Sequence, residues 1–342
     1  MQSKAVVAQA PGKIILSGEH AVVHGAPALA MAINLHTTTT LENYKQHNII
    51  FYLKNLGYTS KTTITKLRAL KERAQHKYQQ FLNNECTIKD VLHRSLELLE
   101  YAFIQITDKF HLHVPEGLKI TTSSTIPPHC GLGSSAASLV SFIHALNHFL
   151  ELDIDILEYF ELARQSENLQ HGISSGLDLH LAINGGCTYF ANKTFIKKTL
   201  PKTPLTIINT GSAAVSTGET VAHTSKILQN NTKLLAGFAE IPTLLSQAIE
   251  SGDIESMREL IKINHKLLKQ INVVPNKVDH FITDIEKLGG AAKICGAGTL
   301  KGDDAGVILI SCDQNIDNLI QKFNYTKLNC TGDTNGVRII SS

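Results

Sequence analysis

The stretch from Pro127 to Ser138 carries the residue types best suited to binding an anion. It reads Pro-Pro-His-Cys-Gly-Leu-Gly-Ser-Ser-Ala-Ala-Ser, between an alternating run typical of a strand and apolar residues at helical spacing. Gly131 and Gly133 lack the Cβ atoms that would hold a phosphate away from the backbone, and Ser134 and Ser135 add hydroxyls. The loop therefore predicts an anion site at a helix N-terminus, with a serine-capped helix as the simpler alternative. It is not a Walker loop, because no lysine follows the second glycine where that motif requires one.

A carboxylate interrupts an apolar helical face further along the chain. Ile156, Phe160 and Ala163 recur at helical spacing, and the same spacing places Glu167 on their face. A carboxylate in such a position must be ion-paired, protonated or bound to a metal. The sequence leaves a buried salt bridge and a metal ligand as two equal alternatives.

Two further segments place charged residues where chemistry could use them. The segment 171–178 is a second Gly-Ser loop, and it ends in Asp178. Near the start of the chain, Lys13 lies in an apolar run that the adjacent Glu19 and His20 then interrupt. Taken singly, each has a simpler interpretation: a helix N-cap for the aspartate, an edge lysine, and a solvated turn. Functional roles for them depend on the motifs being considered together.

The elements that must position these residues alternate along the chain, which favours a mixed α and β protein. A shift to Lys, Thr and Pro near residue 203 predicts a boundary between a first domain over 1–203 and a second over 204–342. A tight glycine turn is expected over 293–298, and two or three amphipathic helices between 218 and 288. The other expected elements are strands over 5–8, 14–16, 28–41, 48–53, 187–190, 205–209 and 306–310, and helices over 64–82 and 87–106.

Composition excludes several classes of protein. The 342 residues suffice for two domains, and 32 basic against 30 acidic residues indicate neither a nucleic acid nor an anionic membrane as partner. The six cysteines show no CxxC spacing, which argues against a metal knuckle or a disulfide framework and suits a reducing compartment. Neither a signal-peptide pattern nor an apolar run long enough to span a bilayer is present, so we expect a cytoplasmic protein.

Three separated motifs resemble those of the GHMP small-molecule kinases: Pro11–His20, Pro127–Ala137 and Lys293–Gly298. Within that superfamily the chain is most similar to the mevalonate kinase family, through Gly18–Gly25 and through Asn264–Leu268. The resemblance implies a two-domain α+β fold. Its N-terminal domain would be like ribosomal protein S5 domain 2, its C-terminal domain would be ferredoxin-like, and ATP and the substrate would meet between them.

The resemblance also implies a role for each matching residue. Asp178 would act as base toward the 5-hydroxyl of mevalonate with Lys13 beside it, and Ser135 and Glu167 would hold Mg²⁺. Glu19 and His20 would lie on the substrate side, together with Lys13 and Asp178. The residues expected to wrap the phosphates of ATP are Pro128, Gly131, Leu132, Gly133, Ser134, Ser135 and Ala136. A homodimer is also expected.

Two departures from the family pattern bear on the substrate. Ser174 stands where the family usually has proline, and Thr299–Gly306 replaces the run of glycines that normally follows the third motif. Asp303 and Asp304 within that segment would repel a nearby phosphate, so we expect a surface turn there. The alternatives are a GHMP kinase for another small hydroxy acid or sugar, and a non-catalytic sensor with the same fold. Retention of all the site residues favours a kinase, because a binding module needs no such set.

Overall fold

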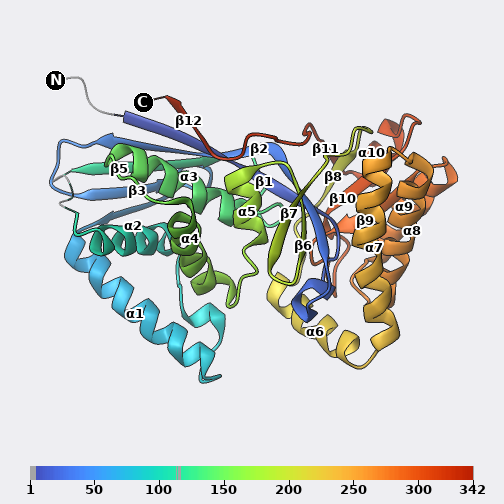
Figure 1. Ribbon diagram of the computed structural model, residues 1–342, viewed down its shortest axis with the longest axis horizontal. Helices are drawn as coiled ribbons and strands as arrows, with labels where there is room; N and C mark the ends of the chain where they lie inside the picture. Colours follow the sequence, from blue (N-terminus) through green and yellow to red (C-terminus); the bar gives the residue numbers. More distant parts are fainter. Residues whose placement is uncertain (1–4, 113, 115–116, 342) are drawn as a thin grey trace.

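The computed structural model describes residues 5–112, 114 and 117–341, and within them the chain builds two β-sheets with helices packed on them (Figure 1). The larger sheet has the strand order β12-β1-β2-β5-β3-β4, with β6 paired to β2 and β7 paired to β6. Its strands are β1 (Ala5–Ser17), β2 (Ala28–Asn43), β3 (Ile49–Leu53), β4 (Tyr58–Thr62), β5 (Leu118–Ser124), β6 (Cys187–Ala191), β7 (Thr194–Lys198) and β12 (Arg338–Ser341).

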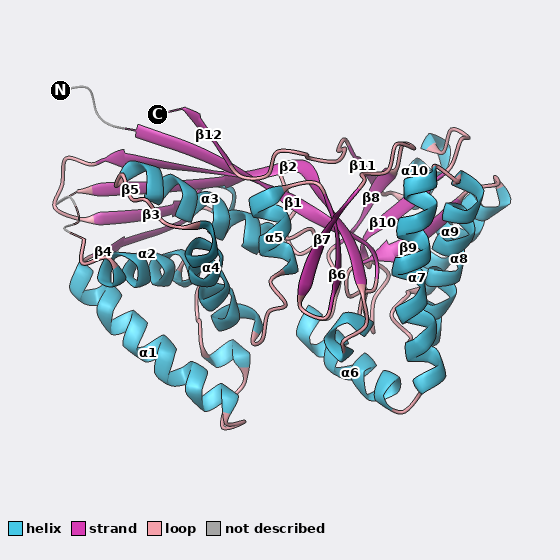
Figure 2. Ribbon diagram, in the orientation of Figure 1, coloured by secondary structure: helices cyan, strands magenta, loops and turns pink. Residues whose placement is uncertain are grey.

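Helices cover one face of this sheet (Figure 2). Helix α3, which follows the glycine-rich loop, packs directly on β1 and β2, and α5 packs beside it on the same strands. Helix α2 reaches β3 through its Phe103, and α4 packs on α2 and α3. The core between them contains fully buried Phe51, Phe103 and Phe142, two pairs of which are in ring contact. The helices are α1 (Ile64–Leu82), α2 (Glu97–Lys109), α3 (Ser134–Phe149), α4 (Ile156–His171) and α5 (Leu177–Asn184).

The second sheet is antiparallel in the order β11-β8-β10-β9 and carries its own helices. Alternation along β9 serves two cores: Ala292 and Ile294 face the helices of the second half, whereas Ala291 and Cys295 join the core of the first. These elements are β8 (Thr206–Gly211), α6 (Thr217–Gln229), α7 (Thr232–Ser251), α8 (Ile254–Gln270), α9 (Asn276–Lys287), β9 (Ala291–Cys295), β10 (Gly306–Ser311), α10 (Asp317–Phe323) and β11 (Thr326–Leu328).

The end of the chain returns to the first sheet, where β12 pairs antiparallel with β1 (Figure 1). Just before β12, the Asp333 carboxylate lies 2.7 Å from His36 Nε2 of β2 and accepts a bond from Arg338. The C-terminal segment therefore links the two halves of the chain. The expected division between residues 203 and 204 stays a prediction.

The α+β architecture expected from the sequence is confirmed, and the helix over 64–82 has the predicted bounds. The helix expected over 87–106 is wrong at its start, because residues 87–96 form a 3-10 turn and bends before α2 begins at Glu97. Four helices, not two or three, lie between 217 and 287, since Gly252 and short polar turns break the amphipathic pattern more often than it indicates. Strands β4, β7, β9, β11 and β12 and helices α5 and α10 were not expected. The glycine turn expected over 293–298 begins only after Cys295, because residues 293–295 belong to β9.

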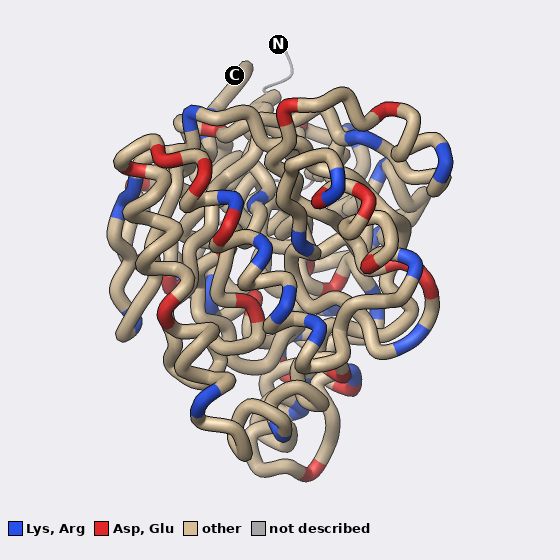
Figure 3. Tube along the Cα trace, turned by 90° about the vertical axis from the view of Figure 1, so that its right-hand side faces the viewer, with Lys and Arg blue, Asp and Glu red and all other residues tan. Residues whose placement is uncertain are grey.

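Charges of both signs are interspersed along the face shown in Figure 3, in keeping with a net charge of +2. Local pairs, and not the net charge, therefore set the electrostatics inside the protein. Across the described residues, helices long and apolar enough to cross a bilayer are lacking.

Candidate active site

The phosphate loop expected from the sequence connects β5 to the N-terminus of α3. Gly133 takes the N-cap position with a φ of 71°, and no side chain caps this end of the helix. The simpler alternative of a serine cap is therefore wrong, because a glycine occupies the cap and leaves the first-turn N–H groups without a side-chain acceptor. Ser134 and Ser135 stand half-buried in that first turn. An uncapped helix start with two hydroxyls can accept an anion.

The first motif packs directly against this loop. The backbone N–H of Lys13 donates to the Leu132 carbonyl at 2.9 Å, and a Cβ atom on Gly12 would lie only 2.7 Å from the same oxygen. A Cβ atom on Gly133 would stand 2.9 Å from Cγ of Lys13 and 3.6 Å from Oδ2 of Asp178. Glycines at these two positions let β1, the loop and α5 approach one another closely.

Lys13 and Asp178 form an ion pair beside Gly133 of the phosphate loop. Their Nζ and Oδ1 atoms are 3.3 Å apart, with the lysine side chain buried and one third of the aspartate side chain exposed. Asp178 lies in the first turn of α5, whose N-cap is Gly176, so the expectation that it might only cap a helix does not hold. A partly exposed carboxylate beside a buried ammonium can accept a proton and stabilise a developing negative charge.

Glu167 is buried on α4, as the apolar spacing predicts, with 4% of its surface exposed. Within the described residues it forms no ion pair, and its Oε2 accepts a hydrogen bond from the Ser174 hydroxyl. Burial, with a smaller contribution from the charge of Asp178, raises the pKa of Glu167 to about 7, and Ser174 and Lys13 oppose that rise. The salt-bridge alternative is therefore wrong. The free-energy cost of burying the charged form of this carboxylate is not offset by an ion pair.

Ser135 faces the same helix as Glu167. Its hydroxyl donates to Oε1 of Gln170 at 3.0 Å, one helical turn beyond Glu167. The structure records no contact between Ser135 and Glu167. Carboxylate, hydroxyl and amide oxygens are hard ligands of the kind Mg²⁺ prefers, and a divalent cation would offset the repulsion between Glu167 and Asp178. The residues present therefore fit such an ion.

Glu19 and His20 lie just beyond β1 and find their partners in the second half of the chain. Glu19 is 2% exposed and pairs with Lys293 of β9, and His20 Nδ1 lies 2.9 Å from the Thr224 hydroxyl of α6. Glu19 Oε2 and His20 Nε2 are buried without a hydrogen-bond partner. Buried polar atoms left unpaired mark positions where a ligand or water is needed.

The third motif also approaches the phosphate loop. A Cβ atom on Gly131 would lie 3.8 Å from the Cα of Gly296, so the two glycine turns face each other. Beyond the motif, Lys301 and Asp303 are exposed, and Asp304 packs against Gly211 with Lys277 3.9 Å away. Residues 301–304 are a surface turn, as expected, whereas Thr299 and Ala305 on either side of it are buried.

Sequence reasoning missed four residues around the site: Gln170, Ser174 as a donor to Glu167, Thr224, and Lys293 as the partner of Glu19. Gln170 could have been found, since it lies three residues after Glu167 on one helix. The partners of Glu19 and His20 could not, because they are separated from them by more than 200 residues.

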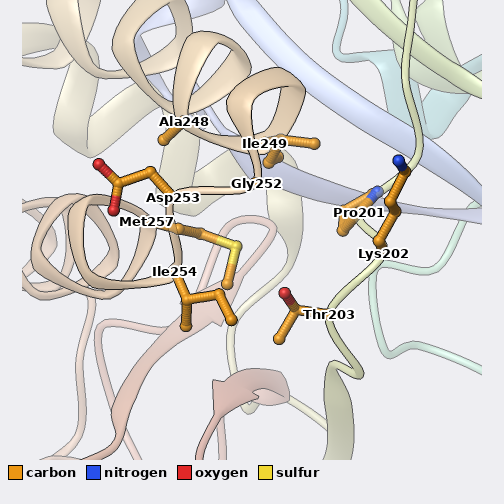
Figure 4. Close-up of a pocket in the computed structure, with 9 residues that line it drawn as sticks. All are labelled: Pro201, Lys202, Thr203, Ala248, Ile249, Gly252, Asp253, Ile254 and Met257. Atoms are coloured by element: carbon orange, nitrogen blue, oxygen red, sulfur yellow. The ribbon is translucent and has the colours of Figure 1, made fainter.

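A small hollow lies elsewhere, between 201–203 and the α7–α8 corner (Figure 4). Ile249, Ile254 and Met257 line it, and its lining includes none of the residues of the candidate site.

Comparison with known proteins agrees with this geometry. Residues 96–186 match the GHMP kinases N-terminal domain, and residues 1–42 match the galactokinase galactose-binding signature. The mevalonate kinase of Archaeoglobus fulgidus is 31% identical over 295 residues, covering 86% of this chain and 89% of the relative. That of Pyrococcus furiosus is 28% identical over 86% of each chain.

Solved structures agree as well. The crystal structure of the Methanococcus jannaschii mevalonate kinase matches with a TM-score of 0.79 at 25% identity, over 97% of this chain and all of that one. A Lactococcus lactis galactokinase matches with a TM-score of 0.72 at 17% identity, which shows the shared fold alone. With its three motifs in contact with one another, and relatives of this similarity along most of its length, the chain belongs to the mevalonate kinase family of GHMP kinases.

Proposed function

We propose that the protein transfers the γ-phosphate of ATP to the 5-hydroxyl of mevalonate, with Asp178 as the base. The observation that carries this proposal is the Lys13–Asp178 pair, 3.3 Å apart beside Gly133 at the start of α3. A phosphate held at that helix N-terminus would lie next to a carboxylate able to accept a hydroxyl proton.

In this proposal the 5-oxygen forms a bond to the γ-phosphorus while the bond to the β-phosphate oxygen breaks. The hydroxyl proton passes to Asp178. A carboxylate is a weak base for an alcohol, so Lys13 contributes by stabilising the negative charge that develops on the oxygen. The free N–H groups of Ser134, Ser135 and Ala136 orient the phosphates, with Gly131, Leu132 and Gly133 shaping the loop and Pro128 bordering it.

Glu167 and Ser135 would hold Mg²⁺, which supplies charge neutralisation to the phosphates when bound. The support for this assignment is a buried carboxylate without a cationic partner and a hydroxyl directed at the same helix. Glu19 and His20 form the substrate side, because each presents a buried polar atom that lacks a partner.

The test is a coupled assay of ADP release with Asp178→Asn and Lys13→Met. Each change should lower kcat by at least ~10²-fold with ATP binding nearly unchanged, because the groups act on the reacting oxygen. The two losses should not add in the double variant, since the residues act as a unit. A fully active Asp178→Asn enzyme would refute the mechanism.

A second candidate substrate is galactose, favoured by the match of residues 1–42 to the galactose-binding signature. That match ends before the phosphate loop, whereas the mevalonate kinase relatives cover most of the chain. A panel of mevalonate, galactose and other small hydroxy acids, scored for ATP-dependent product, decides between them. Product from none of them would favour the sensor alternative.

We further propose a cytoplasmic homodimer. Light scattering of the purified protein tests the dimer, and cell fractionation tests the location. A monomer at micromolar concentration, or recovery with membranes, would contradict the respective proposal.

A further inference from the structure

Lys293 and Glu19 form an ion pair sealed inside the protein. Lys293 lies on β9 with none of its surface exposed, and its Nζ contacts Oε1 of Glu19, which is 2% exposed. The pair connects the third motif to the first, across the two sheets. Its members stand 274 residues apart in the sequence.

Stability alone does not explain such a pair. Removing an ammonium and a carboxylate from water costs several kcal/mol per ion, and their attraction only about offsets this cost. The other contacts of Lys293 Nζ are weak, with the Ile15 carbonyl at 3.5 Å and Cys295 Sγ at 3.7 Å. Ala291 and Cys295 beside it on β9 belong to the apolar core. An apolar side chain could fill this position, so the charge indicates a function.

The pair uses only one oxygen of Glu19. The other, Oε2, is buried and lacks a hydrogen-bond partner. Lys293 therefore fixes the orientation of the carboxylate and leaves its second oxygen available as an acceptor. A carboxylate held in this way can accept a hydrogen bond from a hydroxyl group without changing its orientation.

The neighbouring His20 presents a second buried atom. Its Nδ1 lies 2.9 Å from the Thr224 hydroxyl, which holds the ring in place, and its Nε2 is buried without a hydrogen-bond partner. The acceptor Glu19 Oε2 and the ring atom His20 Nε2 are therefore two neighbouring positions for a polar ligand.

The ring of His20 is neutral near pH 7. Burial lowers its pKa to about 4, the backbone of Ala297 opposes that change, and the charge of Lys293 adds a smaller lowering.

We propose that Lys293 is a positioning residue, which holds the Glu19 carboxylate so that its free oxygen accepts a hydrogen bond from a hydroxyl-bearing substrate beside His20. This inference rests on the proposed function, because it names the groups that receive the substrate in the same site. The third motif would then contribute to substrate binding through Lys293, in addition to the contact that Gly296 makes with the phosphate loop.

The experiment compares Lys293→Met with wild-type protein at a temperature well below unfolding. The KM for mevalonate should rise at least ~10-fold while the KM for ATP stays within about twofold, because the phosphate loop is untouched.

Lys119→Met is the matched control. Lys119 pairs with Glu42 between neighbouring strands, with both side chains more than one third exposed, so its loss should change neither KM. A Lys293→Met enzyme with a lower Tm but a wild-type KM for mevalonate would overturn the proposal. Wild-type protein that never phosphorylates mevalonate would instead overturn the proposed function.

A second variant applies if Lys293→Met alone does not fold. The double variant Glu19→Gln/Lys293→Met removes both charges of the pair together, so it leaves no buried unpaired charge and should fold. Its KM for mevalonate should also rise at least ~10-fold while its KM for ATP stays within about twofold. A double variant with a wild-type KM for mevalonate would overturn the proposal.

Discussion

Replacing Glu167 with glutamine should stabilise the ligand-free protein while abolishing its Mg²⁺-dependent turnover. Glu167 is 4% exposed, has no cationic partner in the described chain, and lies within reach of the charge on Asp178. Glutamine has the same size, and its amide oxygen can still accept from Ser174. The change therefore removes a buried charge and little else.

The magnitude follows from the pKa of Glu167, which is about 7 in the fold against an ordinary value of 4.5. At 1.36 kcal/mol per pH unit, ionising this carboxyl in the fold costs about 3 kcal/mol. The folded protein keeps its proton up to about pH 7, whereas the unfolded chain releases it near pH 4.5. Stability should therefore fall as the pH rises through this window, and level off above it.

The assay is urea unfolding of both proteins at pH 5 and pH 8 without nucleotide. The free energy of unfolding of Glu167→Gln should exceed that of the wild type by up to about 3 kcal/mol at pH 8, and the difference should shrink at pH 5. Mg²⁺ with a nucleotide should stabilise the wild type by mass action and the variant much less.

Glu97 supplies a control of opposite sign. It is equally buried, but Arg73, Arg94 and the backbone N–H of His93 donate to it, and together they outweigh burial and lower its pKa. Glu97→Gln should therefore lose stability at pH 8. A Glu167→Gln protein that is less stable than the wild type at pH 8, or fully active with Mg²⁺, would refute the reasoning.

Two further predictions concern the loops around the site. Replacing Asp303 and Asp304 with asparagine should change the ATP KM by less than about twofold, because exposed charges are screened; a large loss of ATP affinity would show that the altered turn contacts the nucleotide. Gly133→Ala should lower kcat at least ~10-fold, because its Cβ would lie 2.9 Å from Cγ of Lys13 and displace that side chain from Asp178. Gly57→Ala has a similar positive φ but open space around it, so it should cost only about 1–2 kcal/mol of stability and leave kcat unchanged. Equal kcat values for the two variants would contradict the steric argument.

The sequence predicts those parts of the site whose pattern is local. The glycine loop before α3 and the burial of Glu167 follow from spacings of a few residues, which fix the face of a helix or the position of a turn. The predicted start of α2 was wrong because residues 87–96 continue the apolar pattern but do not form an α-helix. Only tertiary packing distinguishes a helix from a turn with the same pattern.

Contacts between residues far apart in the chain could not be predicted from the sequence. Lys13 and Asp178 come together through the packing of β1, the phosphate loop and α5, and their spacing along the chain does not predict that they are neighbours. Lys293 could be recognised as part of a motif, but its burial against Glu19 depends on β9 facing two cores at once. The family resemblance supplied these juxtapositions in outline, and the structure gives the partners.

The pairing between halves also limits what either half can do alone. Glu19 is oriented by Lys293, and His20 by Thr224, both from beyond residue 203. The edge of β1 is covered by β12, the last strand of the chain. A fragment over 1–203 would therefore expose the edge of β1 and place Glu19 in water, where its orientation costs conformational entropy. We infer that the phosphate loop could survive in such a fragment, but that the substrate side would not, because its geometry belongs to the contact between the two sheets.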